Sequence, residues 1–263
     1  MAALIAALSG VPTQAVLVGA RDAMQLADEV RSLPPRIGAV VLQSADLSLA
    51  HEAQRMMAGA ERRPIITVED MWAVSLLAAT AVRLGTLGRY LSDAHVLIAG
   101  APRVPVLVPL LLAAGTPRIT MWCPEDGLPL TRAAPDSDVA INLLGPRFPA
   151  CAISPARADT SVIATRSPDD RCLALPGLLR AIADFAGQVT TRSPDIDVWT
   201  YLRCADGLFD AAEARAHLPS IYSPATTQAV ATVVGEALGN RGDVGPDSAR
   251  CRRRAGAFGR FPG

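Results

Sequence analysis

The chain has 263 residues, of which 50% are hydrophobic and 19% charged, enough apolar material for a core and too much for a disordered protein. Basic and acidic side chains number 25 each, so the net charge is zero and no overall field attracts nucleic acid or an anionic membrane. All 25 basic residues are arginines. The lack of lysine excludes Schiff-base chemistry through a lysine and the phosphate-binding lysine of P-loop enzymes.

Short β-type runs alternate with longer helical stretches along the chain. In chain order, strands are expected at residues 15–18, 38–42, 64–66, 95–100, 118–122, 139–143 and 161–165. Helices are expected near residues 21–33, 49–60, 69–87, 173–185, 198–205 and 226–238, with a further one ending at residue 114. This alternation predicts an α/β fold built on a parallel sheet. Residues 242–263 are rich in Gly, Pro and Arg, so we expect a disordered tail there.

The cysteines, histidines and apolar runs bear on the cellular compartment. The 5 cysteines are scattered without a Cys-x-x-Cys pair, which is typical of reduced thiols, and the 3 histidines show no metal-ligand spacing. No basic stretch precedes the apolar N-terminal residues, which argues against a signal peptide. The most apolar run, residues 104–114, is far shorter than the roughly 20 residues that cross a membrane. We expect a cytoplasmic protein that binds no metal, membrane or nucleic acid.

Residues 96–115 have the frame of a dinucleotide-binding βαβ unit without its chemistry. They read V-L-I-A-G-A-P-R-V-P-V-L-V-P-L-L-L-A-A-G, which is a buried strand, a turn and an apolar helix. The three glycine positions of G-x-G-x-x-G hold Gly100, Pro102 and Pro105. Proline removes an amide donor and adds a ring where the phosphates would lie. Cys123 stands where a ribose-binding acid is expected at the end of the next strand, so we expect no dinucleotide in the usual pose and no cofactor.

Four segments in the same order resemble one family of enzymes. Residues 87–100, L-G-R-Y-L-S-D-A-H-V-L-I-A-G, are similar to the segment before the G-A-G-A-A-G turn of the malic enzymes (malate oxidoreductases), and residues 110–120 continue the match. Residues 161–177 resemble that family's I-V-A-T-G-R-S segment through its A-F-P-G, and I-Y-S-P at residues 221–224 resembles its I-I-P-S-P-F. The resemblance extends over residues 2–238.

The resemblance implies two lobes and a missing part. A Rossmann-like lobe, degenerate at its nucleotide turn, would span residues 69–170. A second α/β lobe would combine residues 1–68 with residues 171–241, and residues 242–263 would be the tail. The family's general-acid tyrosine and general-base lysine belong to its N-terminal part. We expect this chain to be a truncated and degenerate member that lacks that part, since it contains no lysine.

The resemblance also implies that the metal site is lost. The family binds a divalent metal through a Glu-Asp pair, and Gln43 and Ser44 stand at those positions. The third metal carboxylate matches Glu69, while Trp72 replaces a glycine and would fill space in the cleft. One carboxylate, one amide and one hydroxyl make a poor Mg²⁺ site. Without metal, hydride acceptor or lysine, malate oxidation is not expected.

The same positions suggest another chemistry. The carboxylates of Glu69, Asp70 and Asp170 are candidate general bases. The candidate substrate-binding residues are Gln43, Ser44, Asp46, Arg103 and Arg171, in which Arg171 replaces a malate-contacting asparagine of the family. Arginines beside carboxylates suit a small anionic metabolite with a proton to remove. We therefore expect a non-redox elimination, cyclisation or related lyase step in specialised (natural-product) biosynthesis.

Two alternatives remain open from the sequence. The chain could be an inert pseudoenzyme subunit that binds and organises a partner protein, since surface once covered by the missing part could meet a homodimer mate or another biosynthetic protein. It could also be an NAD(P)-dependent oxidoreductase with an unusual cofactor pose. Some site residues have a plainer reading as well, in which Arg103 points to solvent, Asp169 and Asp170 form a turn or a helix cap, and Glu69 is only an N-terminal helix carboxylate.

Overall fold

The computed structural model of the chain describes residues 1–43, 46–57, 63–133, 136–148, 161–164, 168–188, 194–212 and 217–240. The helices are α1 Ala2–Ser9, α2 Ala23–Ser32, α3 Leu47–Met57, α4 Val68–Thr86, α5 Leu107–Ala113, α6 Leu130–Ala133, α7 Leu175–Gln188, α8 Val198–Ala211 and α9 Pro224–Asn240. The strands are β1 Val40–Leu42, β2 Ile65–Thr67, β3 His95–Ala99, β4 Arg118–Trp122, β5 Val139–Asn142 and β6 Ser161–Ala164. The predicted α/β fold is confirmed.

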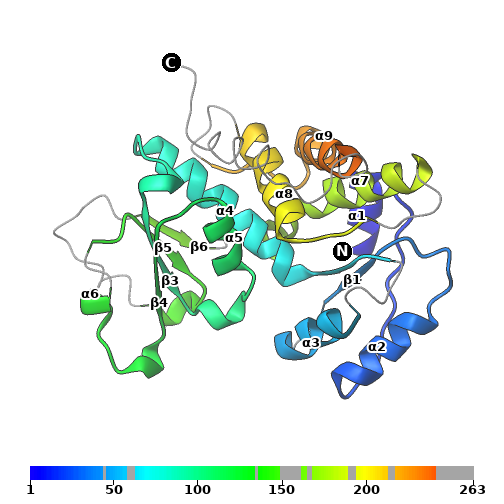
Figure 1. The fold of residues 1–263 in the computed structure, drawn as a ribbon, viewed down its shortest axis with the longest axis horizontal. Coiled ribbons are helices and arrows are strands. Elements are labelled where there is room, and N and C mark those ends of the chain that lie inside the picture. Colours follow the sequence, from blue (N-terminus) through cyan, green and yellow to red (C-terminus); the bar gives the residue numbers. More distant parts are fainter. Residues whose placement is uncertain are drawn as a thin grey trace.

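All paired strands of the described residues run parallel. A four-stranded sheet has the order β4-β3-β5-β6, and a separate two-stranded sheet pairs β1 with β2. Parallel neighbours need crossover connections, and helices α5 and α6 supply them between β3, β4 and β5. Figure 1 shows the larger sheet at one end of the molecule, helices α1, α7, α8 and α9 packed together at the other, and α4 between them. The carboxyl ends of β1 and β2 lie side by side, with Leu42 opposite Thr67.

Helix α4 is the centre of the core because almost every side chain along it is buried. Its start is set by a capping box, in which the hydroxyl of Thr67 accepts from the amide of Asp70 and the carboxylate of Asp70 accepts from the amide of Thr67, both at 3.1 Å. A second, smaller hydrophobic cluster joins α2, α3 and β1. The side chains that connect this smaller cluster to α4 therefore fix its position relative to the main core.

One predicted strand does not form. Residues 15–18 lie in an irregular segment between α1 and α2, and Leu17 is 102% exposed. Strand propensity acts through pairing with neighbouring strands, and within the described residues β1 pairs only with β2. An apolar run of four residues is therefore insufficient evidence for a strand. The predicted tail, residues 242–263, lies outside the described residues.

Helices α7 and α8 approach α9 at glycines. A Cβ added at Gly177 would lie 2.6 Å from the Cβ of Val230, and one added at Gly207 would lie 2.7 Å from the Cα of Val230. A backbone atom cannot rotate out of the way as the end of a side chain can. The close contact at Gly207 therefore requires a residue without a side chain. Gly235, on α9 itself, has no atom within 4 Å of an added Cβ.

We expect Gly207→Ala to destabilise the fold by roughly 1–3 kcal/mol, because the new methyl group must push α9 away. The free energy of unfolding, measured in urea, checks this. Gly235→Ala is the matched control and should be neutral or stabilising by up to about 1 kcal/mol, since alanine is the better helix former. Equal unfolding free energies for the two variants would show that α8 and α9 are not packed as described.

Candidate functional site

The first turn of α4 meets a short 3-10 helix, η6 (Pro168–Cys172), that follows strand β6. The guanidinium carbon of Arg171 lies 4.4 Å from the ring centroid of Trp72, a cation–π contact that holds the cation beside the start of α4. Glu69 and Trp72 share a helix face because they are three residues apart. Their packing against η6 brings together Glu69 and Arg171, two of the residues predicted from the sequence.

Glu69 carries a buried carboxyl group with an open acceptor. The residue is 7% exposed, and its Oε2 atom is buried with no hydrogen-bond partner among the described residues. Burial raises the pKa of Glu69, while positive charge on His51 and Arg171 lowers it and negative charge on Asp70 raises it further. A carboxyl group of this kind holds a proton closer to neutral pH than an ordinary glutamate does. That is the property required of a general acid or base.

Asp70, the next residue, has the opposite environment. Its Oδ2 accepts from the amide nitrogen of the Gln54 side chain at 2.9 Å, the hydroxyl of Tyr201 at 2.9 Å and the backbone amide of Thr67 at 3.1 Å. Its Oδ1 lies 3.6 Å from Nε2 of His51. Burial would raise the pKa of Asp70, but the contacts with these four groups outweigh burial and lower it. Asp70 is therefore an anion surrounded by donors, an arrangement that favours a positioning role.

The predicted substrate-binding residues are dispersed. Asp46 is exposed and caps the start of α3, where it accepts from the amide and hydroxyl of Ser48, which lower its pKa. Gln43 is exposed and follows β1, and Ser44 lies outside the described residues. The guanidinium of Arg103 donates to the carbonyl of Leu143 at 3.1 Å. Arg103 therefore has a structural contact, and the structure does not bring it into contact with Glu69 or Arg171.

Helix η6 supplies further polar groups next to Arg171. Asp170 is half-buried there, and its role as a base stays a prediction. Asp169 accepts a hydrogen bond of 3.0 Å from the hydroxyl of Tyr222, and this contact raises the pKa of Tyr222. Burial raises the pKa of Cys172 to about 11, so this thiol stays protonated and unreactive at neutral pH.

Three residues near the site are not among the predicted ones: His51, Tyr201 and Tyr222. In the sequence, His51 is only one of several scattered histidines, and Tyr222 is only part of the I-Y-S-P motif. Tyr201 lies 131 residues from its partner Asp70, and Tyr222 lies 53 residues from Asp169. No local pattern connects residues so far apart, so only the folded chain reveals these pairs.

The comparison with solved structures is decisive for the fold. No family model and no curated protein matches the sequence. The malic enzyme from Pyrococcus horikoshii Ot3 superposes with a TM-score of 0.75 over 98% of this chain and 74% of that chain, at 14% identity. The chain has the malic-enzyme fold. The NAD-dependent malic enzyme from Thermotoga maritima gives a TM-score of 0.74, 15% identity and coverage of 89% and 76%. The malic enzyme from Entamoeba histolytica gives a TM-score of 0.74 at 13% identity, over 99% of this chain and 72% of that chain.

Within this malic-enzyme fold, the turn after β3 does not fit a dinucleotide in the usual pose. Strand β3 has β4 on one side and β5 on the other, and ligands of such sheets bind where the strand order reverses. Gly100 keeps the left-handed conformation there, with φ of 86°, but a Cβ added to it would lie 2.8 Å from Cδ2 of Leu144. Leu144 therefore packs on the turn, and Pro102 and Pro105 lack the amide donors that a pyrophosphate requires.

The positions that the sequence resemblance implies as metal ligands do not form a metal site either. In the part of the chain that the structure describes, no three His, Cys, Asp or Glu side chains are grouped as a metal site. Gln43 offers only an amide, directly after the end of β1. These residues do not fit a divalent cation of the Mg²⁺ type, which prefers several carboxylate or water oxygens. None of the described helices is long and apolar enough to cross a membrane.

We expect NAD, NADP, Mg²⁺ and Mn²⁺ to leave the melting temperature unchanged. A ligand that binds only the folded chain at 100 times its Kd stabilises by about 2.7 kcal/mol, which a thermal-shift assay detects easily. The malic enzyme from Thermotoga maritima, assayed in parallel, is the positive control. A rise of several degrees with either dinucleotide would show that Leu144 and the two prolines do not block the nucleotide turn.

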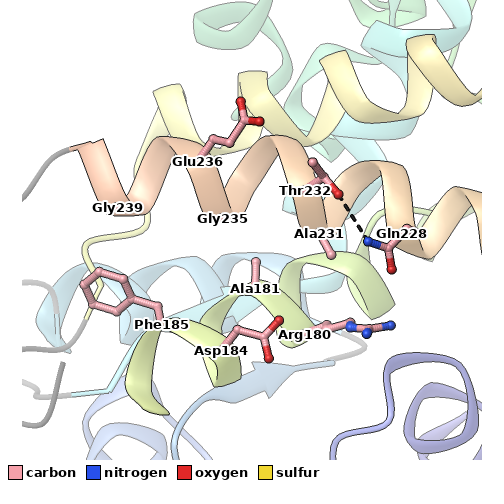
Figure 2. A pocket seen from close by; sticks show the side chains of 10 residues that line it. All are labelled: Arg180, Ala181, Asp184, Phe185, Gln228, Ala231, Thr232, Gly235, Glu236 and Gly239. Atoms are coloured by element: carbon pink, nitrogen blue, oxygen red, sulfur yellow. Dashed lines mark hydrogen bonds between the residues drawn. The ribbon is translucent and has the colours of Figure 1, made fainter. Parts of the chain in front are cut away.

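A groove lies apart from these residues, between α7 and α9. It has a volume of about 250 Å³. Figure 2 shows Ala181 of α7 and Ala231 of α9 pointing toward one another across it, while the carboxylate of Glu236 points away from α7. Arg180 and Asp184 also line the neighbouring hollow beside α1. None of the predicted site residues lines either hollow.

Proposed function

We propose that the chain is a non-redox enzyme that removes a proton from a small anionic metabolite, in an elimination, cyclisation or related lyase step of specialised biosynthesis. The observation that carries the proposal is the Glu69 carboxyl group. It is buried, its Oε2 has no hydrogen-bond partner among the described residues, and burial raises its pKa. Buried groups are normally hydrogen-bonded, so an open buried acceptor is a candidate reactive group.

The proposed chemistry divides between two side chains. Arg171, held against Trp72, pairs with the anionic group of the substrate. Oε2 of Glu69 accepts a proton from the carbon next to that group. The electrons of the C–H bond form the new double bond or ring bond, and the leaving group departs with its own electron pair. Asp70 acts as a positioning group in this scheme, while roles for Gln43, Ser44, Asp46, Arg103 and Asp170 stay predictions.

Proton abstraction can be tested without knowing the substrate. The purified chain is incubated in D₂O with a panel of small hydroxydicarboxylates, keto acids and phosphate esters. The masses of the products are then measured by mass spectrometry. We expect deuterium uptake or loss of water in at least one compound, and neither change with Arg171→Leu. Arg118→Leu, at an exposed arginine of β4, is the matched control and should keep the reaction. No change in any compound would contradict the proposal.

A second candidate is a non-catalytic scaffold, favoured by the groove between α7 and α9, which lies on a surface separate from Glu69. The occupant would be a homodimer mate or another biosynthetic protein. The two functions differ in their need for Glu69. In a host that lacks the native gene, a scaffold carrying Glu69→Gln restores full product formation. An enzyme carrying the same change restores product formation at no more than about a hundredth of the wild-type rate.

A further inference from the structure

The carboxylate of Asp70 is the meeting point of three separate elements. Helix α3 contributes His51 and Gln54, helix α8 contributes Tyr201, and the turn into α4 contributes the amide of Thr67. Helix α3 belongs to the smaller hydrophobic cluster, whereas α4 and α8 belong to the main core. The Asp70 contacts are thus polar connections between the two clusters, at the residue adjacent to Glu69.

We propose that Asp70 and His51 are a positioning pair for Glu69. The pair holds α3 against the start of α4 and sets the charge beside the Glu69 carboxyl group. This inference rests on the proposed function. It assigns a role to His51, which the sequence shows only as an isolated histidine, and it separates the tasks of the two adjacent acids on α4.

The geometry supports a positioning role in two steps. First, the capping box fixes the direction of the first turn of α4, because the side chain of Asp70 is bonded to the residue before that helix. Second, the amide of Gln54 donates both to Asp70 at 2.9 Å and to the carbonyl of Ile65 in β2 at 3.0 Å. Helix α3 is therefore tied to β2 and α4 through one side chain. A shift of α3 would move the charge of His51 relative to Glu69.

Electrostatics distinguishes this role from a merely structural one. The ionisable and charged groups around Glu69 are Asp70 on its own helix, His51 on α3, and Arg171 and the thiol of Cys172 on η6. Tyr201 of α8 contacts Asp70. Removing the negative charge with Asp70→Asn should lower the pKa of Glu69. Removing the positive charge with His51→Gln should raise it. A loss of packing alone would not shift the same carboxyl group in opposite directions.

The experiment measures the titration of Glu69 directly. Protein labelled with ¹³C in the glutamate carboxyl groups is titrated by NMR, and the Glu69 signal is the one absent from Glu69→Gln. We expect its midpoint to move upward in His51→Gln and downward in Asp70→Asn. Once a substrate is known, His51→Gln should also lower kcat by up to about 100-fold with little change in KM, as expected from a misplaced reactive group.

The test does not depend on the folding of both variants. Should Asp70→Asn fail to fold, His51→Gln alone decides, because His51 lies at the margin of the network and is 19% exposed at its side chain. An unmoved midpoint in folded His51→Gln overturns the inference. The NMR titration needs no turnover, so shifted midpoints without activity would uphold the pair and reject the proposed reaction. His217→Gln, at an exposed histidine, is the matched control and should not move the Glu69 signal.

Discussion

We expect the replacement of Glu69 with glutamine to lower turnover in the proposed reaction by roughly 10²–10⁴-fold, the usual contribution of a positioned general base. Glutamine keeps the shape of the side chain but cannot accept the proton. The same change should stabilise the fold at neutral pH, because the wild-type carboxyl group is buried and its pKa is raised. Glu69 therefore adds stability only while protonated. That stability is complete below its unfolded pKa and is lost as the pH rises through its folded pKa.

The measurement is the free energy of unfolding at several pH values, together with the rate of proton abstraction. In Glu69→Gln the loss of stability through the folded pKa of Glu69 should disappear. Glu125→Gln is the matched control, since Glu125 is exposed in the short 3-10 helix η3 (Pro124–Asp126). It should leave both rate and stability unchanged. A Glu69→Gln variant with full activity would remove Glu69 from the reaction.

Replacing Asp70 with alanine should cost about 3–5 kcal/mol of folding free energy, the range for removing one partner of a buried charged network. Three donors lose their acceptor at once, namely the Gln54 amide, the Tyr201 hydroxyl and the Thr67 backbone amide. The free energy of unfolding of a domain is only about 5–15 kcal/mol, so this single change would remove a large fraction of it. Urea unfolding followed by circular dichroism measures the loss.

Asp28→Ala is the control for that prediction, because the side chain of Asp28 is exposed and pairs with Arg31 on the surface of α2. Its effect should stay within about 0.5 kcal/mol. The pKa of Asp70 is lowered, so its contribution to stability is present above its unfolded pKa and is lost as the pH falls through its folded pKa. Wild-type protein should therefore weaken in acid through Asp70, in the opposite sense to Glu69. Equal losses for Asp70→Ala and Asp28→Ala would contradict the network.

The two adjacent acids illustrate the limit of sequence reasoning about the site. The sequence predicts Glu69 and Asp70 together as bases, because both lie in the segment that resembles the metal-carboxylate segment of the malic enzymes. The fold gives them different neighbours: Oε2 of Glu69 has no partner among the described residues, whereas Asp70 receives several donors. Burial and hydrogen bonding act on pKa in opposite directions, and neither can be read from two consecutive letters.

Arg171 and Arg103 differ in the same way. Both are predicted to bind an anion, and both are exposed in the structure. Arg171 stacks on Trp72 beside Glu69, whereas Arg103 donates to a backbone carbonyl of the loop after β5. Arginine has a long side chain, and the partner within its reach depends on which loops the sheet order places next to each other.

The sequence alone determined the alternation of strands and helices, the resemblance to the malic enzymes and the replacement of glycines and carboxylates at their nucleotide and metal positions. The alternation follows from the local pattern of apolar residues, whereas the replacements follow from the resemblance of short motifs to those of the malic enzymes; both can be read without knowledge of the fold. Only the tertiary structure decided that residues 15–18 form no strand, that Leu144 packs on Gly100 and that His51, Tyr201 and Asp70 meet. Such contacts join residues far apart in the chain, and their energies depend on burial and neighbouring charge, which exist only once the core has formed.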